Sequence, residues 1–161
     1  MDEHYKNLSA AAAPEVDNLS SLLFSITNQP SETVVSAVVR FTAFAYWQQP
    51  TVHIASALLP NLEPHPRWKA DCLKAIGSSQ KRLGSYRSAI LSLTTAAILF
   101  LEEGHRSSAA WCNRVASGAH RLLGEYDHAE ALLSDAQIVY TDLEDHFGQA
   151  RCRLDLGRLV R

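Results

Sequence analysis

Apolar residues recur at helical spacing through the second half of the chain, and glycines interrupt the pattern. The spacing of Cys72, Ile76 and Leu83 predicts a helix over residues 68–83, which Gly84 ends. The residues that follow have the same spacing. The pattern is therefore typical of consecutive helices joined by short turns.

The predicted helices pair into hairpins. A partner helix over residues 86–102 ends before Gly104, which is a good C-cap. The second unit has predicted helices near 107–123 and 126–143. Residues 147–161 are expected to begin a third unit without a partner helix.

A fixed period of forty residues supports this division. The stretch LGSYRSA at 83–89 returns as LGEYDHA at 123–129, and the three cysteines, Cys72, Cys112 and Cys152, occupy one position of the repeat. Small residues are expected where helices approach closely, and aromatic residues where a gap is filled. Such a period indicates stacked supersecondary units.

These units resemble the tetratricopeptide repeat family, whose first helix carries small residues, whose turn carries Gly-x-Tyr and whose second helix carries two alanines. The matching positions are Ala70, Ile76, Gly77, Gly84, Tyr86, Ala89 and Ala96 in one unit and Ala110, Ala116, Ser117, Gly124, Tyr126, Ala129 and Ala136 in the next. The period departs from the family's usual length of about 34 residues. The family's first tryptophan and its closing proline are also absent. The resemblance covers residues 67–161 and implies an all-α, right-handed helical-repeat solenoid of antiparallel helix pairs.

Prolines divide the first 66 residues into an initial segment that ends at Pro14 and predicted helices over 15–27, 31–47 and 51–59. The second of these has helical spacing, although its β-branched run VVSAVV is also typical of a strand.

We expect the last two N-terminal helices to pack as a degenerate repeat that caps the array, because about three repeats are needed for a stable solenoid. The chain is then divided into an N-terminal helical segment with this cap, residues 1–66, and a repeat array, residues 67–161. The stretch Pro60–Pro66 is expected to be a rigid link within one solenoid.

Composition excludes several classes of protein. With 161 residues, of which 47% are apolar and 20% charged, the chain can bury one sizeable core. Its most apolar stretch, Ala89–Leu101, is shorter than the roughly 20 residues of a membrane span. The acidic start, the absence of a signal sequence and the odd number of cysteines favour a cytoplasmic protein with reduced thiols. A net charge of -2 predicts no general attraction to nucleic acid or membranes.

Catalysis and metal binding are not favoured. The seven histidines and three cysteines show no zinc-ligand spacing, and the glycines lie at predicted turns rather than in a phosphate-binding loop. His105 beside Glu102 and Glu103 has the chemistry of a general base, but polar loops commonly look like this. We therefore expect no cofactor, no metal and no catalytic residue.

The resemblance also implies a concave groove lined by the first helix of each repeat. Of the fourteen positions that map to the groove, eight are Lys or Arg, whereas the second helices carry Glu130, Asp135 and Asp142 on the convex side. Guanidinium groups hold carboxylates or phosphates bidentately. The predicted partner-binding residues are Lys74, Lys81, Arg82, Trp111, Arg114, Arg121, Arg151 and Arg158.

The function that these positions favour is a non-catalytic interaction module whose groove binds an acidic peptide or protein segment, with Trp111 as an aromatic anchor. Some members of the resembled family bind the C-terminal carboxylate of a chaperone tail through a clamp of basic residues and asparagines. This clamp is not expected here, because Ser78, Val115 and Asp155 stand where two asparagines and a basic residue are needed. We expect Glu at Arg114 and Arg121 to remove binding without changing stability.

Three alternatives stay open. The first is that the basic face is only a solvated helix surface. The second is a structural or self-associating subunit, or a fragment of a longer regulatory array, whose last helix offers an apolar edge made of Cys152, Leu156, Leu159 and Val160. An enzyme is the least favoured reading.

Overall fold

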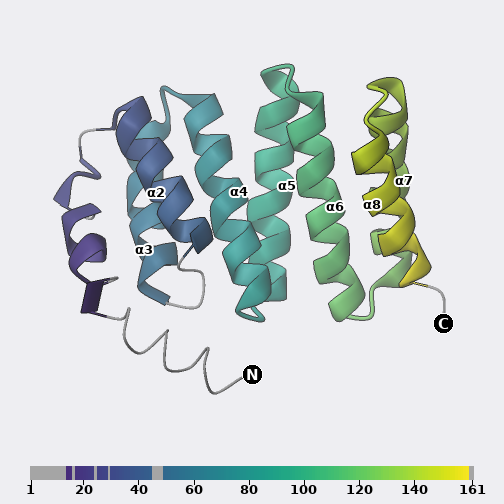
Figure 1. Ribbon diagram of the computed structural model, residues 1–161, viewed down its shortest axis with the longest axis horizontal. Coiled ribbons are helices and arrows are strands. Elements are labelled where there is room, and N and C mark those ends of the chain that lie inside the picture. Colours follow the sequence, from purple (N-terminus) through teal and green to yellow (C-terminus); the bar gives the residue numbers. More distant parts are fainter. Residues whose placement is uncertain (1–13, 16, 24, 29, 45–48, 160–161) are drawn as a thin grey trace.

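The structure is a computed structural model that describes residues 14–15, 17–23, 25–28, 30–44 and 49–159. This part of the chain contains helices and turns but no strand, and its helices stand side by side in a single array (Figure 1). Residues 17–23 are helical. The elements that follow are α2 (Glu32–Phe44), α3 (Gln49–Leu58), the 3-10 helix η1 (Leu59–Leu62), α4 (Pro66–Arg82), α5 (Tyr86–Glu102), α6 (Arg106–Leu122), α7 (Tyr126–Asp142) and α8 (His146–Gly157).

The prediction of an all-α helical-repeat solenoid is confirmed. The run VVSAVV lies in α2 and is helical, so burial of its helical apolar face outweighs the strand preference of β-branched residues. The last helix ends at Gly157, earlier than the predicted 147–161. The initial segment before Pro14, the end of the predicted helix 31–47, and Val160 lie outside the described residues.

Each repeat consists of two helices of equal length joined by turns of one type. Helices α4 to α7 each have 17 residues, and three residues separate them, so the forty-residue period contains two steps of twenty. In each turn the residue after the C-cap takes a positive φ: Gly84 (83°), Gly104 (76°), Gly124 (78°) and Glu144 (54°). The next N–H donates to the last turn of the helix, as Ser85 does to the Gln80 carbonyl at 2.9 Å.

Neighbouring side chains do not restrict the turn at Gly124. Gly124 lies in open space, since an added Cβ would meet only Tyr126, at 4.0 Å. A bulky residue there is therefore disfavoured by the left-handed backbone and not by contacts between helices.

Glu144 occupies the position that glycine holds in the three preceding turns. Replacing Glu144 with glycine should raise the free energy of unfolding by about 0.5–1 kcal/mol, because glycine adopts this φ without a Cβ clash. Chemical denaturation measures the change. A Glu102→Gly variant, placed within α5, should instead be destabilised; a loss of stability for both variants would contradict the argument.

The helices form two layers. The first helices of the hairpins touch along the array, α2 with α4, α4 with α6 and α6 with α8, whereas α3, α5 and α7 make no mutual contact among the described residues. The layer of first helices is therefore the tighter one. Because only the first helices touch one another, we infer that α2, α4, α6 and α8 lie on the concave side of the array.

Small residues fill the space between the layers, as the repeat register predicts. An added Cβ at Gly77 would lie 2.6 Å from Leu93 Cγ, so the Leu93 side chain of α5 packs directly on the backbone of α4. Phe100 and its register partner Tyr140 are both buried. The alanines at matching register positions are also buried: Ala70, Ala89, Ala96, Ala110, Ala116, Ala129 and Ala136.

The N-terminal helices share a core with the array. Helices α2 and α3 pack on each other and on α4. Their apolar cluster includes Val38, Leu58 and Leu62 and continues into α4 through Cys72 and Ile76. No helix within the described residues is long and apolar enough to cross a membrane.

The three cysteines are free and buried, as the sequence indicates. Burial raises the pKa of Cys72 and Cys112 to about 12, and it also raises the pKa of Cys152. The unfolded chain loses its thiol protons near pH 8.5, before the folded chain does, so stability should fall as the pH rises above that value.

Thiol labelling tests this burial directly. At pH 8 the native protein should react with a disulfide reagent far more slowly than a small thiol, and all three cysteines should react once denaturant unfolds the chain. Fast labelling of the native protein would show that the helices open locally around these positions.

Candidate functional site

The concave face brings basic side chains together in two rows. Helices α4, α6 and α8 each contribute two basic residues seven positions apart, and two helical turns separate such residues by about 10 Å. The pairs are Lys74 and Lys81 on α4, Arg114 and Arg121 on α6, and Arg151 on α8 with Arg158 at its C-cap.

The first row borders a hollow of about 170 Å³ between α6 and α8. Four predicted residues line it, namely Lys74, Trp111, Arg114 and Arg151. Tyr140 and Phe147 complete its aromatic wall. The structure thus unites half of the predicted set in one concave site.

Two of these cations lie over aromatic rings. The Lys74 ammonium is 4.8 Å from the centre of the Trp111 ring, and the Arg151 guanidinium is 4.5 Å from the centre of the Phe147 ring. Neither cation has an ion-pair partner within the described part of the chain. The ring covers one side of each cation, so the N–H groups on the other sides can still donate to an anion.

Phe147 was not predicted as a site residue. Its side chain is 68% exposed, which is unusual for a phenylalanine. It precedes Arg151 by one helical turn, and residues with this spacing lie on one face of a helix. The spacing of Phe147 and Arg151 is the sequence signal that could have identified Phe147 as a site residue.

Arg114 differs from its neighbours and corrects an expectation. Its side chain is only 14% exposed, and its guanidinium donates to the Asp155 carboxylate at 2.6 Å. Burial raises the pKa of the nearby Tyr140 hydroxyl to about 12, and the Arg114 charge opposes this shift. Arg114 therefore ties α6 to α8. Glutamate at this position would leave two facing carboxylates, so it would destabilise the fold as well as change the groove.

The second row places Lys81 beside Arg121 and Arg158. The Lys81 ammonium lies directly against Gly118, in the space that a side chain at that position would fill. Burial lowers the pKa of Lys81, and the neighbouring arginines lower it further, whereas Asp155 opposes the shift. Asp155 is engaged by Arg114 and by Arg158, which it contacts at 2.9 Å.

Arg82 lies apart from both rows. It is exposed at the last residue of α4 and follows Lys81 directly, which turns it about 100° around the helix. It does not border the hollow and is not among the groups that shift the Lys81 pKa. The sequence register alone did not separate these two neighbours.

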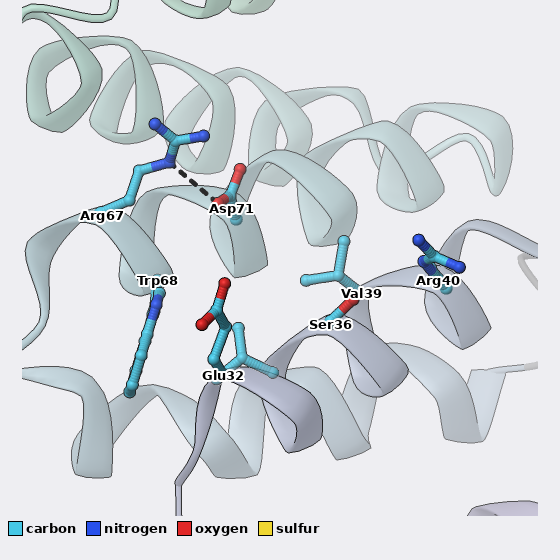
Figure 2. Close-up of a pocket in the computed structure, with 8 residues that line it drawn as sticks. Glu32, Ser36, Val39, Arg40, Arg67, Trp68 and Asp71 are labelled. Atoms are coloured by element: carbon cyan, nitrogen blue, oxygen red, sulfur yellow. Dashed lines mark hydrogen bonds and ion pairs between the residues drawn. The ribbon is translucent and has the colours of Figure 1, made fainter.

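A second hollow, of about 360 Å³, opens between α2 and α4 at the other end of the groove. Glu32 from α2 and Asp71 from α4 both border it, with Trp68 at one side and Arg40 at the other (Figure 2). Asp71 accepts a hydrogen bond from Arg67 at 3.0 Å (Figure 2). This end of the groove is therefore mixed in charge, which the sequence did not reveal because the contribution of α2 was not predicted.

Metal chemistry has no support in the described residues, where no three His, Cys, Asp or Glu side chains are placed to hold an ion. The polar loop with His105 connects α5 and α6, and His105 packs its ring edge to face with Phe100 at 6.4 Å.

No protein-family model matches the chain, and no similar protein is found among curated sequences. Function therefore rests on the chemistry of the groove.

Proposed function

We propose that the chain is a non-catalytic interaction module, of the tetratricopeptide type, that binds an acidic protein or peptide segment in its concave groove. The observation that carries this proposal is a set of four groove cations, from three consecutive first helices, that have no carboxylate partner among the described residues. They are Lys74, Lys81, Arg121 and Arg151.

The surroundings of these cations favour an anionic partner with an apolar anchor. Trp111 and Phe147 offer aromatic surface beside Lys74 and Arg151. Exposed acidic residues, including Glu130 and Asp135, lie on α7 in the other layer. An acidic ligand is thus steered toward the concave face. The buried, reduced cysteines suit a cytoplasmic location.

The groove is tested by reversing two of its free cations. A variant with Arg121→Glu and Arg151→Glu should bind a fluorescent oligoglutamate peptide at least about tenfold more weakly than the parent, because each change replaces attraction with repulsion. Binding to the parent should also weaken with rising salt, since charges are screened over about 10 Å at 0.1 M ionic strength. Fluorescence anisotropy measures both effects.

Arg153→Glu is the matched control for this variant. Arg153 is exposed on α8 two residues after Arg151, so it faces away from the hollow and its reversal should change affinity little. Circular dichroism should show an unchanged helical signal in both proteins. Equal affinity of the parent and the double variant would mean that the basic side chains are merely a solvated face.

A second function, self-association or a structural role, is favoured by the open face of α8. Ala150 and Gly157 are exposed, whereas their register partners Ala70, Ala110 and Gly77 are buried under the next helix. The edge differs from the expected one, because Cys152 is fully buried and Leu156 and Leu159 pack in part on the α7 core. Light scattering tests this function. If the parent protein is a monomer at all concentrations, and Gly157→Arg does not change its molecular mass in solution, self-association through this face is excluded.

A further inference from the structure

The second row of the groove concentrates positive charge at one point. Three consecutive first helices each contribute one residue to what we call the Lys81 cluster: Lys81 from α4, Arg121 from α6 and Arg158 from α8. Gly118 leaves room for the Lys81 ammonium to lie close to α6. A side chain there would push the amine away from the arginines.

The protein neutralises only part of the cluster, because Arg158 pairs with Asp155 whereas Lys81 and Arg121 do not. Asp155 is the one carboxylate that acts on the Lys81 pKa, and its two oxygens bind Arg114 at 2.6 Å and Arg158 at 2.9 Å. Lys81 and Arg121 have no ion pair within the described residues. Cations held this close together repel one another, so the site favours a ligand with more than one negative charge.

We propose that the Lys81 cluster binds a phosphorylated side chain of the partner segment. The inference rests on the proposed acidic-segment function and names the anion at this end of the groove. A carboxylate brings one charge and two oxygens, whereas a phosphorylated serine or threonine brings nearly two charges and three strong acceptors. Donors that converge from three helices match the phosphoryl group better than they match a carboxylate.

The first row of basic residues, Lys74, Arg114 and Arg151, indicates where the rest of the bound partner segment lies. Trp111, which lines the aromatic hollow, lies seven residues before Gly118, against which the Lys81 ammonium lies, and two helical turns cover about 10 Å. An extended chain covers this distance in about three residues. The bound segment therefore carries an apolar or aromatic side chain about three residues from its phosphorylated residue.

The opposite end of the groove argues against a nucleic acid as the source of the phosphate. There Glu32 and Asp71 border the hollow between α2 and α4 beside Arg40 and Arg67 (Figure 2), so this end of the groove lacks the continuous row of unpaired cations that a chain of phosphates needs. The net charge of the chain, -2, likewise lacks the general excess of cations that nucleic-acid binding needs. A single phosphoryl group on a protein segment fits the confined cluster.

Three labelled peptides test the proposal. They share a tryptophan and differ at a position three residues away, which holds phosphoserine, glutamate or serine. The phosphoserine peptide should bind at least about tenfold tighter than the glutamate peptide, the gain of one further hydrogen bond between charged groups. Arg121→Met and Lys81→Met should each remove most of this preference. Arg40→Met is the matched control and should keep it, because Arg40 lines the hollow at the other end.

Inorganic phosphate provides a second measurement that does not depend on the peptides. Its binding should raise the pKa of the Lys81 amine, followed by NMR, because a bound anion favours the ammonium form. Equal affinities for phosphoserine and glutamate peptides, with no response of Lys81, would overturn the phosphate assignment and leave the acidic-segment function standing. Failure of all three peptides to bind would overturn both. A single-stranded oligonucleotide that competes with the phosphopeptide at similar affinity would overturn the protein source.

Discussion

Replacing Phe100 with alanine should lower the free energy of unfolding by about 3–5 kcal/mol. The ring is fully buried at the junction of α4, α5 and α6, in a cluster that includes Leu73, Leu93 and Val115. Because these neighbours belong to three helices, they cannot all move into the space that the ring leaves. A domain of this kind is typically stable by about 5–15 kcal/mol, so the loss would take a large share of the total.

Leu101→Ala is the control for Phe100→Ala. It removes a large side chain from the next position of the same helix, where the side chain is 52% exposed, and should cost far less. Urea denaturation, followed by circular dichroism, gives both values. Similar losses for the two variants would show that Phe100 does not hold the helices together.

The second large effect is expected for Ala129→Arg. Ala129 is fully buried in the first turns of α7, so an arginine would overpack the helix contact and place an unpaired charge inside it. The combined cost should exceed about 3 kcal/mol and unfold the C-terminal hairpins before the rest of the array, as repeat proteins lose stability unit by unit.

Ala131→Arg provides the comparison. Ala131 is exposed on the same helix, and arginine has a high helix propensity, so this variant should keep the melting temperature of the parent. Hydrogen exchange would show the difference as early exchange in α6, α7 and α8 for Ala129→Arg alone. If both variants melted together with the parent, the close packing of α7 on α6 would be wrong.

The fold could be predicted from the sequence because its determinants are local and periodic. Helix α5 spans Tyr86–Glu102, the range that the apolar spacing and the flanking glycines predict. The forty-residue register also predicted which small residues of α4 to α7 are buried, since these hairpins repeat the same contacts, whereas Ala150 and Gly157 on α8 are exposed. Position 144 is the exception. There a glutamate takes the turn conformation that glycine takes elsewhere, so the residue type does not reveal it.

The state of each groove cation depends on partners that are distant in the chain. The sequence does not distinguish Arg114 from Arg121, and both are predicted groove cations. In the structure Arg114 forms an ion pair with Asp155, 41 residues away, whereas Arg121 has no ion pair among the described residues. Burial and pairing arise from how α8 packs against α6, and no local spacing encodes that contact. The same holds for the hollow between α2 and α4, which Glu32 and Asp71 both border because the N-terminal helices join the array. Helix position thus specified most of the basic residues that face the groove, with Arg82 as the exception, and packing between repeats decided which of them are left without an ion pair.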